Sequence, residues 1–356
     1  MAVTIRDVAR VAGVSVGAIS RILNNDPSLI VTEETRQLVW DVVRKMHYKP
    51  LRHRRKVNAV KKLAVFIATS NEEEVRDPYW ALVREGVEQQ AEQLGYIVSK
   101  SVRKNGNFME FAHECAVNEI DGILAIGSIT SDTIKHFVPD VPHIVFISYR
   151  PKDSAFDSIW SDLETATRNI IDYFLSEDYH SIGFIGGVER ALSINEAGLV
   201  SYIENIDPRM HAYCKYMKKL DLYQESNLYI ADTWDSEEGY KVMKKVLSQK
   251  NFPQAMIIAN DMMAIGALSA IQESGLHVPD DMAIISFNDI QAASCMHPPL
   301  TTVRIAAKEM GIQAVKLLES RFDGRDYPVS KILPTRLIIR GSCGGNPGNA
   351  FERYIL

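Results

Sequence analysis

Two short amphipathic helices separated by a glycine constrain the first 24 residues to a small helical domain. Ile5, Val8 and Ala9 lie at helical spacing after Thr4, a residue that favours the N-cap position. Gly13 interrupts this pattern, and a second apolar stripe follows, formed by Ile19, Ile22 and Leu23. Two helices joined by a glycine turn form a helix-turn-helix; a helical hairpin without a DNA-binding role is the alternative.

The outer face of the second helix is small, polar and cationic. It carries Gly17, Ser20, Arg21 and Asn24 at helical spacing, opposite the apolar stripe. The planar guanidinium of an arginine can donate bidentate hydrogen bonds to O6 and N7 of guanine. We therefore expect this face to enter the major groove of DNA, with Arg21 as a base-reading residue.

A third amphipathic helix completes this N-terminal domain. Thr32 is a suitable N-cap, two glutamates follow it in the first turn, and Pro50 ends the helical pattern. The residues predicted to face inward are Leu38, Val39, Val42, Val43 and Met46. Three helices in about fifty residues lie near the lower size limit of independently folding domains.

The charge of the chain is unevenly distributed. Residues 1–62 contain 13 Lys and Arg against 5 Asp and Glu, whereas the whole chain has a net charge of −5. A basic N-terminal domain on an acidic body suits a nucleic-acid reader joined to a ligand-binding module. The four cysteines are widely scattered and predict neither disulfides nor a metal site. The N-terminus has no signal-peptide pattern and no apolar run is long enough to span a membrane, so we expect a cytoplasmic, nucleoid-associated protein without membrane contact.

From Leu63 onward, short apolar runs alternate with helical patterns. We expect strands at 63–68, 96–99, 122–126, 143–148, 181–187, 228–231, 255–259 and 283–287, and helices that include 79–94, 237–247 and 262–274. Alternating strands and helices predict parallel sheets covered by helices on both faces. Two such series predict two similar lobes that bind a ligand beyond the carboxyl ends of their strands.

The N-terminal domain closely resembles the DNA-binding domain of the LacI/GalR family of bacterial repressors, in the runs IRDVARVAGVSVGAISRILN and VTEETRQLVWDVVRKMHYKP. The resemblance continues through the body and implies an all-α helix-turn-helix head on a two-lobed α/β, periplasmic-binding-protein-like body. It implies three chain crossings between the lobes, at 156–162, 288–292 and 322–327. The implied division is a head (1–50), a basic hinge (51–62), an N-terminal lobe (63–157 and 292–322), a C-terminal lobe (158–291 and 323–341) and a tail (342–356).

The resemblance assigns DNA contacts to Thr4, Ser15, Val16, Gly17, Ser20, Arg21 and Asn24. In the family, the positions of Val16 and Gly17 set base preference; small or apolar residues there imply contact with thymine methyl groups or close backbone approach. Val57 falls where the family wedges an apolar side chain into the minor groove. Arg54 stands at a typically small position in a very basic linker, so a linker that binds phosphates is the alternative to a hinge helix.

Three aromatic residues follow strands of the body and are candidates for stacking on a sugar ring. The resemblance places effector contacts at Tyr79 and Trp80, in the run DPYW, and at Trp234, in the run ADTWDSEEGY. A position in the core is the alternative for Trp80, and a surface loop is the alternative for Trp234.

Three asparagines complete the predicted effector site. The resemblance assigns Asn260 to effector hydroxyls, although a helix cap is the alternative. Asn288 stands where most family members have a carboxylate, and an amide both donates and accepts hydrogen bonds. Alignment on Gly198 puts Asn195 where the family has an arginine, and the loss of a guanidinium favours a neutral sugar over a purine or a carboxylate-bearing corepressor.

Four runs taken together, DPYW, IWSDL, FNDI and HPPLTTVRI, look most like the branch of the family that contains the evolved-β-galactosidase repressor and galactose-operon regulators. This resemblance implies a homodimeric repressor that binds double-stranded operator DNA and is released by galactose or a β-galactoside. A corepressor-type regulator and a soluble sugar-binding protein are the alternatives. No GK[ST], GxSxG or HExxH motif is present, so we expect neither an enzyme nor a bound cofactor or metal.

Overall fold

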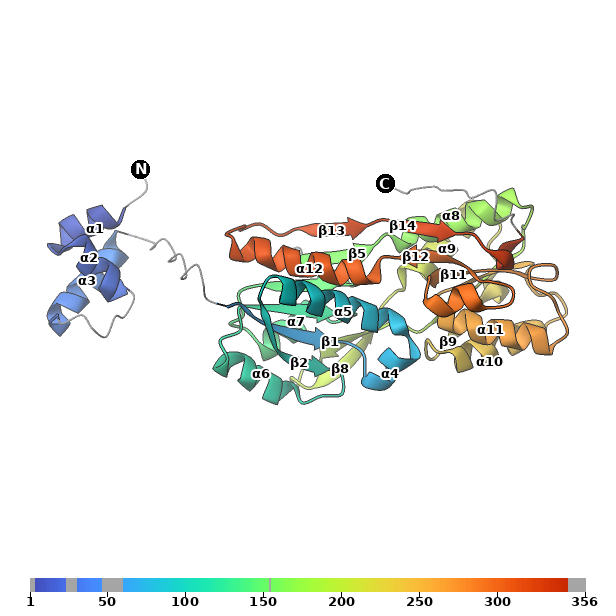
Figure 1. Cartoon of the computed structure of the whole chain (residues 1–356), viewed down its shortest axis with the longest axis horizontal. Helices are drawn as coiled ribbons and strands as arrows, with labels where there is room; N and C mark the ends of the chain where they lie inside the picture. The colour runs from blue at the N-terminus through green and yellow to red at the C-terminus, as the bar shows by residue number, and fades with distance from the viewer. Residues whose placement is uncertain (1–3, 24–30, 47–59, 154, 345–356) are drawn as a thin grey trace. The chain divides into compact units, whose positions relative to one another are not determined.

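The computed structural model describes residues 4–23, 31–46, 60–153 and 155–344. The chain divides into two compact units, a head up to Val60 and a body from Lys61 onward. The head contains helices α1 (Ile5–Ala12), α2 (Val16–Leu23) and α3 (Glu33–Lys45) (Figure 1). All three predicted helices are therefore present.

The ends of the first two helices follow from their sequence. The backbone N–H of Thr4 donates to the Asp7 carboxylate at 3.0 Å, and the Thr4 hydroxyl donates to it at 2.7 Å. Gly13 ends α1 with a φ of 68°, a conformation that strains residues with a side chain. At the start of α2, the Ser15 hydroxyl accepts a hydrogen bond from the Ala18 N–H at 3.1 Å.

The core of the head lies between the three helices. Its buried residues are Val8, Ala9, Ala12, Ile19, Ile22, Val39, Val42 and Val43. The inward position predicted for Leu38 is wrong, because its side chain is 49% exposed. Successive residues of a helix differ by about 100° in direction, so Leu38 cannot share the face of Val39. The half-buried Trp40 packs against this core instead.

The body contains two six-stranded sheets. The N-terminal sheet has only parallel pairs, in the order β13 (Ser330–Leu333), β5 (Asp157–Ser161), β4 (Ile144–Ile147), β3 (Gly122–Ile126), β1 (Lys62–Ile67) and β2 (Ile97–Arg103). The C-terminal sheet has the order β14 (Thr335–Ile338), β12 (Thr301–Ile305), β11 (Ala283–Asn288), β10 (Ala255–Ile258), β6 (Ile182–Gly187) and β9 (Leu228–Ala231). In this second sheet β14 runs antiparallel to β12 and the other pairs are parallel. The eight predicted strands are confirmed.

Helices cover the two sheets. Those of the N-terminal lobe are α4 (Asn71–Arg76), α5 (Pro78–Gln93), α6 (Phe108–Val117), α7 (Ser131–Phe137) and α12 (Ala307–Phe322). Those of the C-terminal lobe are α8 (Leu163–Ser176), α9 (Pro208–Lys219), α10 (Ser236–Leu247) and α11 (Asp261–Glu273). Helix α5 lies along α12, and α10 lies along α11 (Figure 1). The predicted architecture, a helical head and a two-lobed α/β body with three crossings, is thereby confirmed.

The chain crosses between the lobes at Asp162, Ala306 and Pro334. Asp162 follows β5 and lies in the first expected segment, 156–162. The predicted boundary between residues 157 and 158 is wrong, because it assigns most of β5 to the C-terminal lobe, whereas β5 belongs to the N-terminal sheet. The crossings expected at 288–292 and 322–327 are wrong. Strand β12 pairs with β11, so residues 292–305 stay in the C-terminal lobe. Strand β13 pairs with β5, so residues 323–333 stay in the N-terminal lobe.

A physical reason accounts for these two errors. The polar segments that were expected to cross are turns between elements of one lobe. The chain crosses instead at Ala306, directly after β12, and at Pro334, which separates β13 from β14 by a single residue. A crossing within such an extended stretch leaves no loop signal in the sequence.

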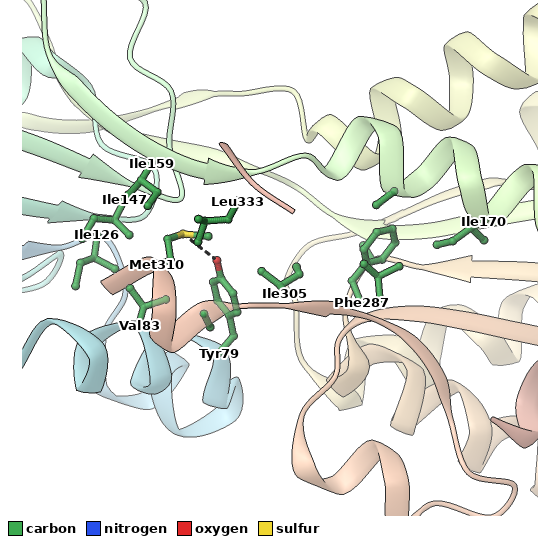
Figure 2. Close-up of a cluster of buried hydrophobic side chains, with 14 of the residues drawn as sticks. Tyr79, Val83, Ile126, Ile147, Ile159, Ile170, Phe287, Ile305, Met310 and Leu333 are labelled. Atoms are coloured by element: carbon green, nitrogen blue, oxygen red, sulfur yellow. Dashed lines mark hydrogen bonds between the residues drawn. The ribbon is translucent and has the colours of Figure 1, made fainter. Parts of the chain in front are cut away.

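One core cluster extends through both lobes. Figure 2 shows Tyr79 and Met310 at the N-terminal lobe and Phe287 at the C-terminal lobe, with Ile305 between them. Ile305 is the last residue of β12 and directly precedes the crossing at Ala306. The crossing therefore lies against continuous apolar packing that joins the two lobes.

Candidate functional site

The exposed face of α2 carries most of the predicted DNA contacts of the head. Val16, Gly17 and Arg21 are exposed, and Ser20 is half-buried. A Cβ atom at Gly17 would meet the Ser15 hydroxyl at 3.9 Å and nothing closer among the described residues. Packing within this part of the chain therefore does not require a glycine there.

The remaining predicted DNA contacts fall into two groups. Thr4 and Ser15 are exposed, and they cap the starts of α1 and α2. Asn24 and Val57 lie outside the described residues, as does most of the basic linker.

In the body, side chains from both lobes meet where the strands of the two sheets end. The Asn260 amide donates to the Asp77 carboxylate at 3.4 Å, and the Ser128 hydroxyl donates to the Glu189 carboxylate. A third pair joins Arg76 and Asp235 at 3.3 Å. We name this region the interlobe site and define it by Asp77, Trp80, Ser128, Glu189, Arg209, Trp234, Asn260 and Asn288.

Arg209 is the buried cation of the interlobe site. Its Nε lies 3.0 Å from Oδ1 of Asp207, and its Nη2 lies 2.5 Å from Oδ2 of the same carboxylate. Its Nη1 donates to the Ala259 carbonyl at 2.5 Å. Burial disfavours the charged guanidinium, but the attraction of Asp207 outweighs it and raises the pKa of Arg209. The cation is thus fixed in place by an ion pair with the residue that caps its own helix.

Arg209 is not among the predicted site residues, and the prediction that Asn195 replaces the guanidinium of the site is wrong, because Arg209 supplies it. A signal was present in the sequence. Asp207 and Pro208 open α9, and the carboxylate accepts hydrogen bonds from the backbone N–H groups of Arg209 at 2.9 Å and Met210 at 3.2 Å. Asp77 and Pro78 open α5 in the same way. The repeated Asp-Pro helix start marks two of the helices that begin at the interlobe site.

The structure does not bring Asn195 to the interlobe site, which corrects its predicted role. Asn195 lies in the turn of a hairpin formed by β7 (Arg190–Ile194) and β8 (Val200–Glu204). Its side-chain oxygen accepts hydrogen bonds from the N–H groups of Ala197 and Leu199, both at 3.0 Å. Asn195 therefore stabilises this turn.

The hairpin spans the two lobes. It follows β6 of the C-terminal sheet, yet the Leu192 N–H donates to the Ser128 carbonyl at 2.8 Å. The Thr130 N–H donates in turn to the Leu192 carbonyl at 2.9 Å, and Leu192 is buried in a core cluster of the N-terminal lobe. This hairpin is not among the elements predicted from the sequence.

Trp234 lies against the carboxyl end of β6. A Cβ atom at Gly187 would be 2.8 Å from two ring atoms of Trp234, so this glycine makes room for the indole. The indole Nε1 donates to the Val188 carbonyl at 3.2 Å, and the Arg209 guanidinium carbon lies 5.0 Å from the ring centroid. Trp234 is half-buried in the interlobe site rather than in a free surface loop.

Asn260 acts as the cap of α11. Its oxygen accepts from the Met263 N–H at 2.7 Å, and its amide nitrogen donates to the Trp234 carbonyl at 2.9 Å as well as to Asp77. With 2% of its surface exposed, it positions Trp234 and Asp77. The neighbouring Asp261 is buried among hydroxyl groups, and burial raises its pKa to about 6.

Tyr79 and Trp80 differ in burial and in the groups that they contact. Tyr79 is 8% exposed, and its hydroxyl contacts Ser148 and the sulfur of Met310, so the role of ligand platform is wrong for it (Figure 2). Burial raises the Tyr79 pKa to about 12. Trp80 is half-buried, and its ring lies 3.5 Å from the point that a Cβ of Gly127 would occupy, at the end of β3.

Asn288 ends β11 in an unusual backbone conformation. Its φ is 108°, and the next residue, Asp289, has a φ of 55°. Asp289 pairs with Arg304 and Arg340, each at 2.6 Å. Such strained residues cluster at ligand sites, and these two ion pairs hold the strain in place.

Two buried hydroxyl groups of the N-terminal lobe lack a hydrogen-bond partner among the described residues. They belong to Thr69, which follows β1, and Ser161, which ends β5. A buried hydroxyl without a partner costs about 1–3 kcal/mol. Both lie at the carboxyl ends of strands, where a bound polar molecule would satisfy them.

Within the described ranges, no helix is long and apolar enough to cross a membrane. The same part of the chain contains no group of three or more His, Cys, Asp or Glu side chains that could hold a metal ion.

Two family models match the chain. The model of "Bacterial regulatory proteins, lacI family" matches residues 4–50, and that of "Periplasmic binding protein-like domain" matches residues 171–343. The repressor MelR of Bacillus subtilis is 38% identical over 347 residues, which cover 96% of this chain and 98% of MelR. The regulator GalR of Lacticaseibacillus casei is 33% identical, over 95% of this chain and 99% of GalR.

Solved structures show the same fold. The lac repressor dimer bound to operator and an anti-inducer superposes with a TM-score of 0.67 at 22% identity, covering 96% of this chain and 99% of the repressor chain. The regulator CelR in complex with cellobiose gives a TM-score of 0.67 at 23% identity, with the same coverage.

Proposed function

The chain belongs to the LacI family of bacterial regulatory proteins, and on that premise we propose that it is a homodimeric repressor of a sugar-utilisation operon, released from double-stranded operator DNA by galactose or a galactoside. Its relatives are DNA-binding transcriptional regulators and not enzymes, and the same holds for this chain. It acts on nucleoid DNA in the cytoplasm under this proposal.

The arrangement of Arg209, Asp207 and Trp234 is the observation that supports a neutral sugar as effector. A guanidinium has five N–H donors, and the contacts with Asp207 and Ala259 occupy three of them. The two remaining donors suit hydroxyl groups. Because Asp207 already balances the charge of Arg209, the site does not call for an anionic ligand. The indole of Trp234 beside this cation offers an apolar surface for a sugar ring.

The face of α2 supports DNA reading. Arg21 is exposed and has the geometry for bidentate contact with guanine. The absence of a side chain at Gly17 permits close approach of the backbone to the floor of the groove. One head of this size buries little surface, so two heads on a pseudo-palindromic operator are needed for high affinity.

Release follows from coupling between the sugar and the arrangement of the lobes. A sugar shifts the equilibrium between lobe arrangements only by its difference in affinity for them, typically about 1–3 kcal/mol. The Asn260–Asp77 and Ser128–Glu189 hydrogen bonds join the lobes at the interlobe site. A ligand bound there would directly affect both hydrogen bonds between the lobes.

Isothermal titration of the full-length protein tests the effector. Galactose, methyl β-galactoside, lactose and allolactose are the expected ligands, with glucose, ribose and hypoxanthine as controls. We expect saturable binding of a galactoside and none of hypoxanthine. Binding of hypoxanthine alone would contradict the proposal, and a ligand that tightens operator binding would make the chain a corepressor-type regulator.

A further inference from the structure

Glu189 lies between the two lobes, and it is not one of the site residues predicted from the sequence. The preceding residue, Val188, is held in the C-terminal lobe, where its N–H donates to the Ala231 carbonyl at 2.9 Å. Three residues after Glu189, Leu192 is hydrogen-bonded to Ser128 and Thr130 of the N-terminal lobe. The Glu189 carboxylate thus lies at the base of the hairpin, where the hairpin leaves the C-terminal lobe and reaches over to the N-terminal lobe.

The carboxylates of this region differ in how many of their oxygen atoms are used. Asp77 accepts from the Tyr79 N–H through Oδ1 and from Asn260 through Oδ2. Both oxygens of Asp207 bind Arg209. Asp289 uses its two oxygens for Arg304 and Arg340.

Glu189 retains a free acceptor. Its Oε1 accepts from the Ser128 hydroxyl, and its Oε2 has no hydrogen-bond partner among the described residues. Burial raises the pKa of Glu189, although the Ser128 hydrogen bond and the nearby Arg209 oppose this effect. A carboxylate oxygen in such surroundings is stabilised by additional donors, and the hydroxyl groups of a sugar are suitable donors.

From these contacts we propose that Glu189 determines effector specificity, its free oxygen accepting a hydrogen bond from one hydroxyl group of the bound sugar while the other oxygen holds Ser128. This inference rests on the proposed function and adds a contact to it. One hydroxyl of the effector then contributes both to affinity and to the contact between the lobes, because the same carboxylate makes both bonds.

Titration of full-length variants against galactose and its 2-, 3-, 4- and 6-deoxy derivatives tests this inference. Ser128→Ala removes the contact between the lobes and leaves the carboxylate in place. Glu189→Ala removes both hydrogen bonds, and Glu189→Gln keeps the size of the side chain. Glu196→Ala is the matched control, because Glu196 is exposed on the same hairpin.

We expect Glu189→Ala to weaken galactose binding by a further factor of roughly 10 to 100 beyond Ser128→Ala, the range for a hydrogen bond to a charged group. This additional loss should vanish for one deoxygalactose, namely the derivative that lacks the contacted hydroxyl. Glu196→Ala should bind like the wild-type protein. Circular dichroism and operator binding of each variant establish that it is folded.

Two results would overturn the inference, and they differ from failure of the proposed function. The double variant Ser128→Ala/Glu189→Ala is titrated as well. If it loses the same galactose affinity as Ser128→Ala and Glu189→Ala do singly, Glu189 serves only to join the lobes. If the additional loss is the same for all deoxy derivatives, no single hydroxyl contacts Glu189. If the wild-type protein binds none of the sugars, the proposed effector class is wrong and the inference falls with it.

Discussion

Replacement of Arg209 by methionine tests whether this guanidinium is both a structural and a ligand-binding group of the interlobe site. Methionine has a similar length and no charge. It would leave Asp207 with its two backbone N–H donors but without the guanidinium, and the Ala259 carbonyl without its side-chain donor. Arg209→Lys retains the charge but cannot reach both oxygens of Asp207 and the Ala259 carbonyl at once.

The expected magnitude follows from burial and partners. Asp207 is 5% exposed, and removing one partner of a buried ion pair typically costs about 3–5 kcal/mol. The two backbone hydrogen bonds that Asp207 keeps favour the lower end, so we expect the free energy of unfolding of the body to fall by about 3 kcal/mol. Loss of hydrogen bonds from a charged donor should weaken galactoside binding roughly 10- to 100-fold.

Urea unfolding followed by tryptophan fluorescence and titration with a galactoside give the two quantities. Arg190→Met is the matched control, because Arg190 is exposed at the start of the hairpin. It should change neither quantity. If Arg209→Met unfolds and binds sugar like the wild-type protein, the assignment of Arg209 to the interlobe site is wrong.

Three further predictions concern single residues. Arg21→Ala should abolish specific operator binding and leave galactoside affinity intact; unchanged operator affinity in a mobility-shift assay would remove Arg21 from base reading. Trp234→Ala should raise the Kd for the sugar roughly 30-fold, about 2 kcal/mol, with operator binding retained, and an unchanged Kd would show that the indole does not contact the ligand. Asp261 should oppose folding increasingly between pH 4 and 6, because it ionises near pH 3.8 when unfolded and near pH 6 when folded. The difference in unfolding free energy between Asp261→Asn and the wild-type protein should therefore change by about 2 kcal/mol over this range, and a constant difference would contradict the raised pKa.

The strands of the body could be predicted from the sequence because fully buried parallel strands appear as short apolar runs. Ile123 to Ile126 in β3 and Ala255 to Ile258 in β10 are buried on both faces of their sheets, and no polar residue interrupts them. Edge strands such as β13 and β8 carry exposed polar side chains and gave no such signal.

The contents of the interlobe site were harder to predict, because they depend on contacts between distant segments. Arg209 and Trp234 are 25 positions apart in the sequence and stack only after α9 and the loop following β9 are in place. Tyr79 and Trp80 are neighbours in one helix, yet one is in the core and the other at the end of β3. The hairpin of β7 and β8 lies between β6 and α9, so alignment on Gly198 points to Asn195 rather than to Arg209.

Fluorescence anisotropy of the full-length protein on the palindromic DNA of its own promoter, with galactosides added at a fixed salt concentration, tests the central claim most directly. We predict specific binding that a galactoside reverses and that glucose, ribose and hypoxanthine leave unchanged. Absence of specific DNA binding, or binding that no sugar weakens, would contradict the account of a sugar-released repressor.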